Sequence, residues 1–399
     1  MIEELESLKT MNLENWYDFP EGKLISTCIQ CGTCSGACPY GEYMDYTPRR
    51  IIKLLQLGQI EKVFNSDSMM NCVNCYACMV KCPRNIHLTE VLLQLVKEQT
   101  FSRLTNVPAE LQKALENTFR YGNPLGESGR KRINWTQDLE KPVRILSQNP
   151  EPVDILWFVE SYPAYYPRCQ ETAKAIAKLL QTLEIDFAIL GNDERSAGEC
   201  GLLSWEPGLN ESLIDHNLAI MGKYKFNRLI TSDPHALDAL NFRYKMYGFE
   251  FETSHVIPFI FEHFEKLKPM LTRELHYSVT YHDSCCLGRH NNVFDEPREL
   301  LKAIPGIHLI EMIHNRENAI CCGGGGGGNW LDAYFKAKGM ERLSDIRIKE
   351  AIETGADILA VACPYEIPRF EDALKVAGYD KKMVVKDITE LLLESMEEK

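Results

Sequence analysis

The sequence lacks long apolar runs, an apolar start and an excess of basic residues. Its longest apolar stretches, such as Ile358–Cys363, are far too short to cross a bilayer. Residues 1–10 are acidic without an apolar core, so no export signal is expected. Lys and Arg number 44 against 57 Asp and Glu, and the net charge of −13 disfavours binding to nucleic acid, whose phosphates select a basic face. We therefore expect a cytoplasmic protein without a transmembrane segment, which reaches the inner membrane face only through a partner.

Cysteine, in contrast, is abundant. The 15 cysteines are clustered, and an odd number cannot pair completely. Without export, disulfides are not expected either. Metal binding is therefore the better interpretation of these residues.

Eight cysteines form two runs with the spacing Cys-x2-Cys-x2-Cys-x3-Cys-Pro. This spacing is typical of two-cluster ferredoxins, in which the last cysteine of each run binds the other [4Fe–4S] cluster. The two predicted ligand sets are therefore Cys28, Cys31, Cys34 and Cys82, and Cys72, Cys75, Cys78 and Cys38. Gly32 would let the backbone approach the inorganic sulfide. A pair of zinc sites is the alternative, but zinc ribbons use paired Cys-x2-Cys motifs instead of two runs of four.

Local patterns divide the chain into four regions. Residues 1–101 predict a small helical domain, with helices at 47–58 and 88–101 after the cysteine runs. Residues 102–150 are interrupted by glycines and predict a linker. Residues 151–270 and 271–399 each alternate short apolar strands with amphipathic helices, which predicts parallel sheets. The expected fold class is α+β and multidomain: a helical two-cluster domain followed by two α/β units.

The expected elements of the α/β units are specific enough to compare with a structure. The strands are expected at residues 154–159, 186–190, 228–231, 254–257, 278–282, 308–311, 357–362 and 383–386. The helices are expected at residues 170–183, 211–221, 234–247, 297–303, 330–353, 364–376 and 388–397.

The two α/β units are predicted to be copies of one ancestral unit. Residues 231–236 align with 361–366, Ser161 aligns with Cys285, and residues 196–198 align with 321–323. These similar offsets indicate an internal repeat. At these aligned positions cysteines occur only in the second copy, so the first unit is expected to be degenerate.

The second copy carries the remaining cysteine cluster. Its members are Cys285, Cys286, Cys321, Cys322 and Cys363. They follow predicted strands, and such loops converge at the carboxyl edge of an open sheet. The adjoining glycines, among them Gly323, Gly324 and Gly325, have no Cβ and would wrap around an inorganic core. A third cluster site is the prediction; small buried cysteines beside a flexible linker are the alternative.

Several neighbouring residues have weaker signals. His282, Arg289 and His290 flank the third cysteine cluster. They are candidates for supplying protons or binding an anionic substrate, and supporting or surface roles are the alternative. Cys169 and Cys200 are isolated and are expected to be structural.

These motifs resemble the heterodisulfide-reductase-like proteins. Residues 28–39 and 48–52 resemble the ferredoxin-like, C-type component of heterodisulfide reductase, and residues 282–291 and 317–325 resemble its B-type component. Together they are similar to the fused D-type form over nearly the whole chain. The resemblance implies cysteine-rich CCG domains, each of which holds a noncubane [4Fe–4S] cluster in the B-type component. It implies ligand and catalytic roles for Cys285, Cys321, Cys322 and Cys363.

The chain also departs from the family pattern. Glu366 stands where the fifth cysteine is expected, and Cys286 is an alternative fifth ligand. In the first unit, the expected ligand positions hold other residues, namely Ser161, Ser196, Ala197, Asp233 and Ala236. No cluster is expected there. Because the family enzyme is thought to split its disulfide between two noncubane centres, a single centre cannot act in the same way.

Two functions fit these observations. The first is an iron–sulfur oxidoreductase subunit, in which two [4Fe–4S] clusters feed a CCG-domain cluster that reduces or oxidises a thiol or disulfide substrate. His282 and Arg289 would then act beside the catalytic cysteines. The second is a pure electron-transfer subunit that links a flavoprotein, or another redox subunit, to a membrane cytochrome b or quinone-reactive partner. The cysteine pairs of the sequence favour the first function.

Overall fold

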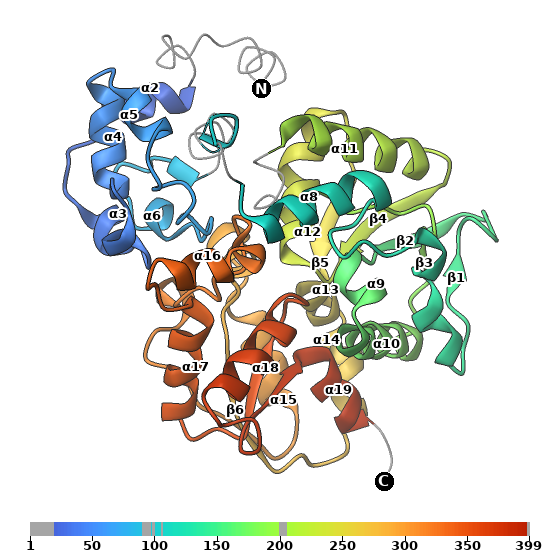
Figure 1. Ribbon diagram of the computed structural model, residues 1–399. Helices are drawn as coiled ribbons and strands as arrows, with labels where there is room; N and C mark the ends of the chain where they lie inside the picture. Colours follow the sequence, from blue (N-terminus) through green and yellow to red (C-terminus); the bar gives the residue numbers. More distant parts are fainter. Residues whose placement is uncertain (1–19, 90–96, 98–99, 105–106, 199–205, 397–399) are drawn as a thin grey trace.

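The fold is described from a computed structural model covering residues 20–89, 97, 100–104, 107–198 and 206–396 (Figure 1). Cys200 and most of the expected helix at 88–101 lie outside these residues. Among the described residues, no helix has both the length and the apolar character needed to cross a membrane.

The N-terminal domain is helical, as predicted. Its elements are α2 (Pro20–Ser26), α3 (Thr33–Gly36), η2 (Gly41–Tyr43), α4 (Pro48–Gln56), α5 (Ile60–Phe64) and α6 (Ala77–Val80). Helix α4 begins at Pro48, directly after Thr47, because proline tolerates the first helical turn, where its missing N–H has no partner to lose. The helix buries Ile51, Ile52 and Leu55 in the domain core.

Residues 102–150, expected as a linker, are folded against the first α/β unit. They contain α8 (Ala109–Tyr121), η4 (Gly129–Lys131), η5 (Asn134–Asp138) and β1 (Arg144–Ile145). Strand β1 pairs in parallel with β3 (Phe187–Ile189). Trp135 is buried and meets Trp157 edge to face, with ring centroids 5.4 Å apart. The glycines of this stretch lie at helix ends and in turns between the buried positions. A segment rich in glycine therefore packs as part of the core.

The first α/β unit is built on a five-stranded parallel sheet with the order β1-β3-β2-β4-β5. Besides β1 and β3, the strands are β2 (Val153–Phe158), β4 (Phe226–Thr231) and β5 (Glu252–His255). The helices are α9 (Ser161–Tyr165), α10 (Pro167–Thr182), α11 (Pro207–Met221), α12 (Pro234–Asp238), the π-helix η7 (Ala239–Tyr244), α13 (Val256–Glu262), α14 (Phe264–Leu267) and η8 (Lys268–Met270).

The second α/β unit is built on a four-stranded parallel sheet with the order β7-β6-β8-β9. The strands are β6 (Tyr277–Tyr281), β7 (Ile307–Leu309), β8 (Ile358–Val361) and β9 (Val384–Asp387). The helices are the π-helix η9 (Cys286–His290), α15 (Glu296–Ala303), η10 (Arg316–Asn318), η11 (Gly328–Trp330), α16 (Asp332–Ala337), α17 (Leu343–Glu353), α18 (Glu366–Val376) and α19 (Ile388–Met396).

The two sheets repeat one topology once β1 is set aside. In each unit the first of the remaining strands lies between the second and the third, and the fourth follows the third. Strands β2 to β9 all coincide with expected strands, with boundaries shifted by a few residues at most. The expected helix at 330–353 is instead two helices, α16 and α17, because Gly339 adopts a left-handed conformation (φ 70°) that ends the first. The α+β multidomain fold class is confirmed.

The two α/β units are joined through helices α10 and α19 (Figure 1). Arg168 on α10 forms a bidentate pair with Glu390 on α19, at 2.6 and 3.0 Å, and a further pair with Glu371 on α18 at 3.0 Å. The Cys169 thiol donates to the Pro364 carbonyl at 3.2 Å. At this interface the residues that follow strand β4 of the first unit face those that follow strand β8 of the second unit.

Candidate iron–sulfur sites

The eight N-terminal cysteines line two separate pockets. One pocket, with about 310 Å³ of atom-free space, is lined by Cys28, Cys31, Cys34 and Cys82. The other, with about 430 Å³, is lined by Cys38, Cys72, Cys75 and Cys78. The last cysteine of each run therefore lies with the first three of the other run. This is the grouping that the ferredoxin spacing predicts; the ligand roles themselves stay a prediction.

The two cysteine loops share an unusual backbone path. The third residue of each motif, Gln30 or Asn74, has a positive φ, as does the fifth, Gly32 or Tyr76. Left-handed residues bend the chain sharply and turn successive N–H groups inward. The Gln30 N–H donates to the Cys28 sulfur at 3.4 Å. Such loops form a concave cradle for a group rich in negatively charged sulfur.

The state of the thiols agrees with the binding of a cationic iron core. Every cysteine in the described part of the chain is a free thiol. Burial, followed by the neighbouring thiols of Cys75, Cys72 and Cys78, holds the pKa of Cys38 well above its usual range. Four thiols crowded into one buried pocket are costly to ionise together unless a positive centre neutralises them. Donor type, number and spacing therefore all fit a [4Fe–4S] cluster.

All five cysteines of the second α/β unit lie beyond the carboxyl ends of its strands, and Cys285, Cys286, Cys321 and Cys322 share one buried cluster. Cys285 follows β6, Cys321 and Cys322 lie in the loop after β7, and Cys363 follows β8. The Cys321 thiol lies 4.0 Å from the Cys285 sulfur, and the Gly323 N–H donates to Cys321 at 3.2 Å. All five are at most 5% exposed. The neighbouring thiol of Cys321, followed by burial, raises the pKa of Cys322 well above its usual range.

Glu366 occupies the position expected for a fifth cysteine, and its carboxylate faces this cluster. One carboxylate oxygen of Glu366 and one donor atom each of His282 and Cys322 lie within 4.8 Å of one another. The Glu366 Oε1 atom lies 3.3 Å from His282 Nε2. His282 is fully buried, and its Nδ1 accepts from Arg347 Nε at 3.0 Å. His282 is thus oriented by Arg347 and lies beside both Glu366 and Cys322.

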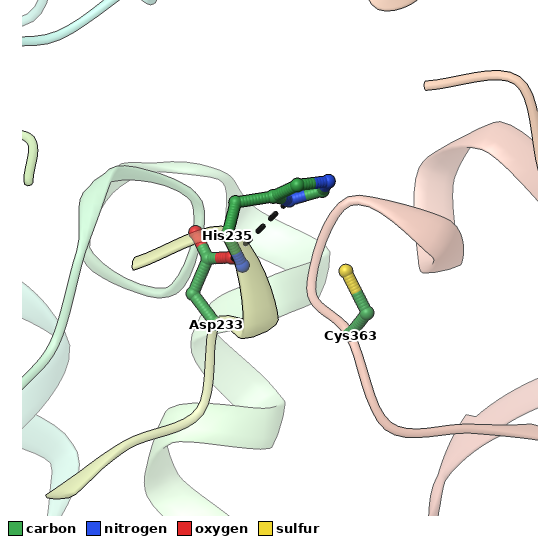
Figure 2. Close-up of side chains that lie close together, drawn as sticks. All are labelled: Asp233, His235 and Cys363. Carbon is green, nitrogen blue, oxygen red and sulfur yellow. Dashed lines mark hydrogen bonds and ion pairs between the residues drawn. The ribbon is translucent and has the colours of Figure 1, made fainter. Parts of the chain in front are cut away.

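A second group of donor atoms joins the two α/β units. Asp233 and His235 come from the first unit, Cys363 comes from the second, and their donor atoms lie within 4.8 Å of one another (Figure 2). All three residues are buried. Asp233 and Cys363 are aligned positions of the repeat, so corresponding strand ends of the two units face each other here.

A buried ion pair anchors the loop that carries Cys285. Arg298 donates to both carboxylate oxygens of Asp283, at 2.7 and 2.8 Å, and its Nε donates to Glu311 at 2.6 Å. The Arg316 N–H donates to Asp283 Oδ2 at 2.7 Å. Bidentate pairing of this kind holds the planar groups in one geometry, so the start of the cysteine loop is rigidly placed.

Arg289 connects the third cysteine cluster with the N-terminal domain. Its Nε donates to the Cys75 carbonyl at 2.6 Å, and its NH1 group donates to the Ala319 carbonyl at 2.7 Å. Burial lowers the pKa of Arg289, but the thiols of Cys75, Cys285 and Cys321 outweigh burial and raise it. One guanidinium therefore faces the second pocket and the third cysteine cluster at once.

The glycine run is in contact with the same N-terminal loop. A Cβ on Gly325 would lie 2.7 Å from the Val73 carbonyl oxygen, and one on Gly326 would overlap the Cys72 carbonyl oxygen. A Cβ on Gly324 would meet the Asn329 side chain at 2.9 Å. Gly323 donates to a cysteine sulfur, whereas Gly325 and Gly326 allow the backbones of two domains to approach closely.

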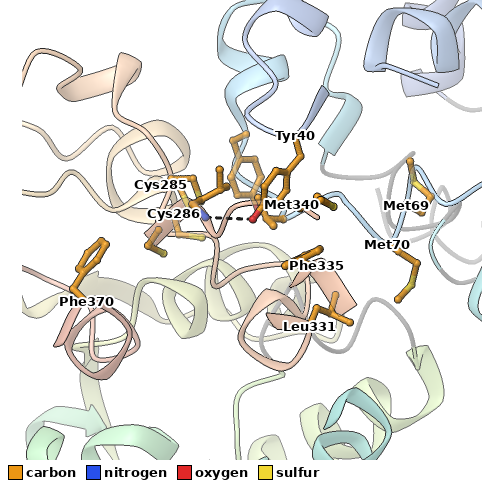
Figure 3. Packing of buried hydrophobic residues seen from close by; sticks show 14 of the residues in the cluster. Tyr40, Met69, Met70, Cys285, Cys286, Leu331, Phe335, Met340 and Phe370 are labelled. Atoms are coloured by element: carbon orange, nitrogen blue, oxygen red, sulfur yellow. Dashed lines mark hydrogen bonds between the residues drawn. The ribbon is translucent and has the colours of Figure 1, made fainter. Parts of the chain in front are cut away.

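Aromatic packing reinforces this junction. Cys285 and Cys286 lie in the same buried cluster as Tyr40, Phe335 and Met340 (Figure 3). The Tyr40 ring lies 5.1 Å from that of Phe335, and its hydroxyl donates to the Glu341 carbonyl at 3.2 Å. One apolar core therefore continues from the N-terminal domain into the second unit.

His290, a third predicted neighbour of this cysteine cluster, contacts the N-terminal domain and the first unit. His290 stacks on Tyr76 of the second cysteine loop, with ring centroids 4.2 Å apart, and pairs with Asp238 at 2.8 Å. Sequence reasoning missed His235, because a histidine shortly after a strand end, in a unit with no cysteine at the aligned ligand positions, carries no motif. Its alignment with Tyr365, two residues after Cys363, is the signal that would have drawn attention to it.

Comparisons with known families agree with this architecture. Residues 24–86 match the 4Fe-4S dicluster domain, and residues 162–237 and 279–365 each match the cysteine-rich domain CCG. The second match spans Cys285, Cys321 and Cys363, and the first spans the degenerate unit. Iron–sulfur clusters are thus the cofactors of this chain, as predicted.

Curated relatives share the same arrangement at modest identity. A probable iron-sulfur-binding oxidoreductase, FadF, from Bacillus subtilis is 31% identical over 91% of this chain, which spans 50% of FadF. An EtfAB:quinone oxidoreductase from Syntrophomonas wolfei is 27% identical over the whole chain, which spans 62% of that protein. The D component of the dihydromethanophenazine:CoB–CoM heterodisulfide reductase from Methanosarcina barkeri is 28% identical over 93% of this chain and 94% of its own length. The chain therefore carries a match to the 4Fe-4S dicluster domain followed by two matches to the CCG domain, and over most of its length it is similar to the D component of a heterodisulfide reductase and to an iron-sulfur-binding oxidoreductase.

Proposed function

We propose that the chain is an electron-transfer subunit whose three iron–sulfur sites form one relay, leading from the surface of the dicluster domain to the second CCG unit. The observation that carries this proposal is the position of Arg289, which lies in the short helix that follows Cys285 and donates to the carbonyls of Cys75 and Ala319. Clusters bound at these sites would supply one-electron donors and acceptors. The residues between them keep the sites adjacent and exclude water.

The two ends of the proposed relay differ in exposure. At the first pocket Cys31 is exposed, and the neighbouring Ile29 is 64% exposed. An accessible cluster with an apolar rim suits electron exchange with a docked protein. The cysteines of the third site are buried instead. We infer that the dicluster domain is the docking site for a flavoprotein or another redox subunit, and that the other partner is a membrane cytochrome b or a quinone-reactive subunit.

Reduction or oxidation of a thiol or disulfide at the third site is the second candidate. It is favoured by the number of donors there, because five thiols and Glu366 exceed what four irons require from the protein. A surplus donor can give way to a substrate sulfur. Full burial of all five cysteines ranks this candidate below the relay. Adding a thiol or disulfide and recording the electron paramagnetic resonance (EPR) spectrum distinguishes them, since only substrate binding changes the signal of the third centre.

Replacing Arg289 by glutamine tests the relay. The positive charge stabilises the reduced, more negative state of both centres that it faces, so its loss lowers both reduction potentials. We expect shifts on the order of tens of millivolts, since a partly buried charge acts over several ångströms. An EPR-monitored redox titration measures the potential of each centre separately.

Two control variants define what this result means. Arg289→Lys keeps the charge, and we expect smaller shifts. Arg369→Gln removes an arginine whose Nε donates to the Cys322 carbonyl at 2.7 Å, so only the third centre should shift. A change confined to one centre in Arg289→Gln would contradict the shared position of this arginine between two sites.

A further inference from the structure

His235 belongs to the degenerate CCG unit but lies at the cysteine site of the other unit. Its ring, the Asp233 carboxylate and the Cys363 sulfur place their donor atoms within 4.8 Å of one another (Figure 2). All three side chains are at least nine-tenths buried. The first unit has no cysteine at any aligned ligand position, so a metal ligand that it lends to the second unit must be another kind of side chain.

The local fold places the imidazole firmly. Asp233 caps helix α12, with the His235 N–H donating to Asp233 Oδ1 at 2.8 Å. The same carboxylate oxygen lies 3.3 Å from His235 Nδ1. A carboxylate beside one ring nitrogen is common in histidines that bind a metal through the other nitrogen.

The remaining surroundings direct the ring toward the cysteine site. Tyr365, two residues after Cys363, meets the His235 ring edge to face, with centroids 5.2 Å apart. On the glycine run, a Cβ at Gly325 would lie 3.9 Å from His235 Nε2. The Nε2 edge of the ring thus lies beside the glycine run that follows Cys321 and Cys322.

We propose that His235 is an imidazole ligand of the iron–sulfur site in the second CCG unit. This inference rests on the proposed function, because it requires a third cluster. The first unit, which lacks cluster ligands of its own, would then lend the neighbouring site a neutral nitrogen donor in place of one of that site's own thiolates. Histidine ligands raise the reduction potential of an iron–sulfur cluster relative to thiolates alone. Such a ligand would raise the reduction potential of the last centre of the relay and so favour electron transfer toward it.

The test uses the full-length protein purified anaerobically with ¹⁵N-labelled histidine. Pulsed EPR detects the coupling between the electron spin of the third centre and a coordinated nitrogen. We expect a histidine coupling in the wild type and its loss in His235→Gln. The variant His235→Cys should keep the iron content, lack the coupling and have a lower potential at the third centre only.

His255→Gln is the matched control. His255 is also buried in the first unit, but Nε2 contacts the Ser232 carbonyl at 2.9 Å and Nδ1 accepts from the Ile257 N–H at 3.2 Å. Both nitrogens are therefore committed, and this variant should keep the coupling. A coupling that persists in both His235 variants, or its absence from a wild type with about twelve irons, overturns the ligand role alone. A wild type with about eight irons overturns the third cluster and the proposed function with it.

Discussion

Replacing Cys82 by alanine is expected to remove the cluster whose other ligands lie in the first cysteine run. Cys82 lines the pocket of Cys28, Cys31 and Cys34, although it belongs to the second run. A missing thiolate leaves one iron without its protein ligand, and the loss of the whole cluster lowers the iron content by about four per chain. Iron analysis and EPR of the anaerobically purified variant measure the change.

Double substitutions test the crossed grouping itself. Cys31→Ala added to Cys82→Ala strikes the same cluster, so iron should fall no further. Cys75→Ala added to Cys82→Ala strikes the other cluster, so the total loss should reach about eight irons. If each run held its own cluster, the two double variants would exchange these results.

The second large effect is expected at Gly326, where an alanine would push the second CCG unit away from the dicluster domain. Gly326 has a φ of 63°, and its Cβ would overlap the Cys72 carbonyl oxygen and lie 2.9 Å from Val73 Cα. Backbone atoms cannot move aside as a flexible side chain can. We expect Gly326→Ala to lower the midpoint of thermal unfolding by several degrees and to slow reduction of the third centre through the dicluster domain.

Gly339→Ala is the matched control for this substitution. Gly339 has a similar φ of 70°, but a Cβ there would meet nothing within 4 Å. Both variants carry the strain of a left-handed alanine. The difference between their free energies of unfolding therefore isolates the cost of the steric overlap at Gly326, about 1–3 kcal/mol for overpacking. Equal stabilities, with unchanged reduction of the third centre, would mean that this contact does not hold the domains together.

Much of the fold was predictable because its signals are local. The cysteine spacing predicted which thiols share a pocket. The proline and the three-residue gap at the end of each run act only on the direction of the neighbouring cysteine. The alternation of apolar runs predicted strands β2 to β9. The repeat, seen in residues 231–236 and 361–366, anticipated two sheets of one topology.

The rest depends on contacts between distant segments. Trp135 becomes a core residue only when β1 pairs with β3, and nothing near it in the sequence distinguishes this stretch from a linker. Likewise, glycines look alike in sequence, and only packing assigns Gly323 to a cysteine and Gly326 to the dicluster domain. His235 lies 128 residues before Cys363, and only the docking of the two units joins them.

The burial of the third cysteine cluster changes which of the two candidate functions is favoured. In the sequence, the pairs Cys285-Cys286 and Cys321-Cys322 favoured sulfur chemistry. In the structure they are buried and Arg289 links them to the dicluster domain, which favours relay. Exposure of a side chain cannot be read from a motif, because it depends on every element that packs over it.

The most direct test of this account is the iron and acid-labile sulfide content of the anaerobically purified chain. Three four-iron clusters predict about twelve irons and about twelve sulfides per chain, in a brown protein with three reducible centres. About eight irons would contradict the relay by removing its third centre, and a colourless, zinc-loaded protein of unchanged fold would contradict all three sites.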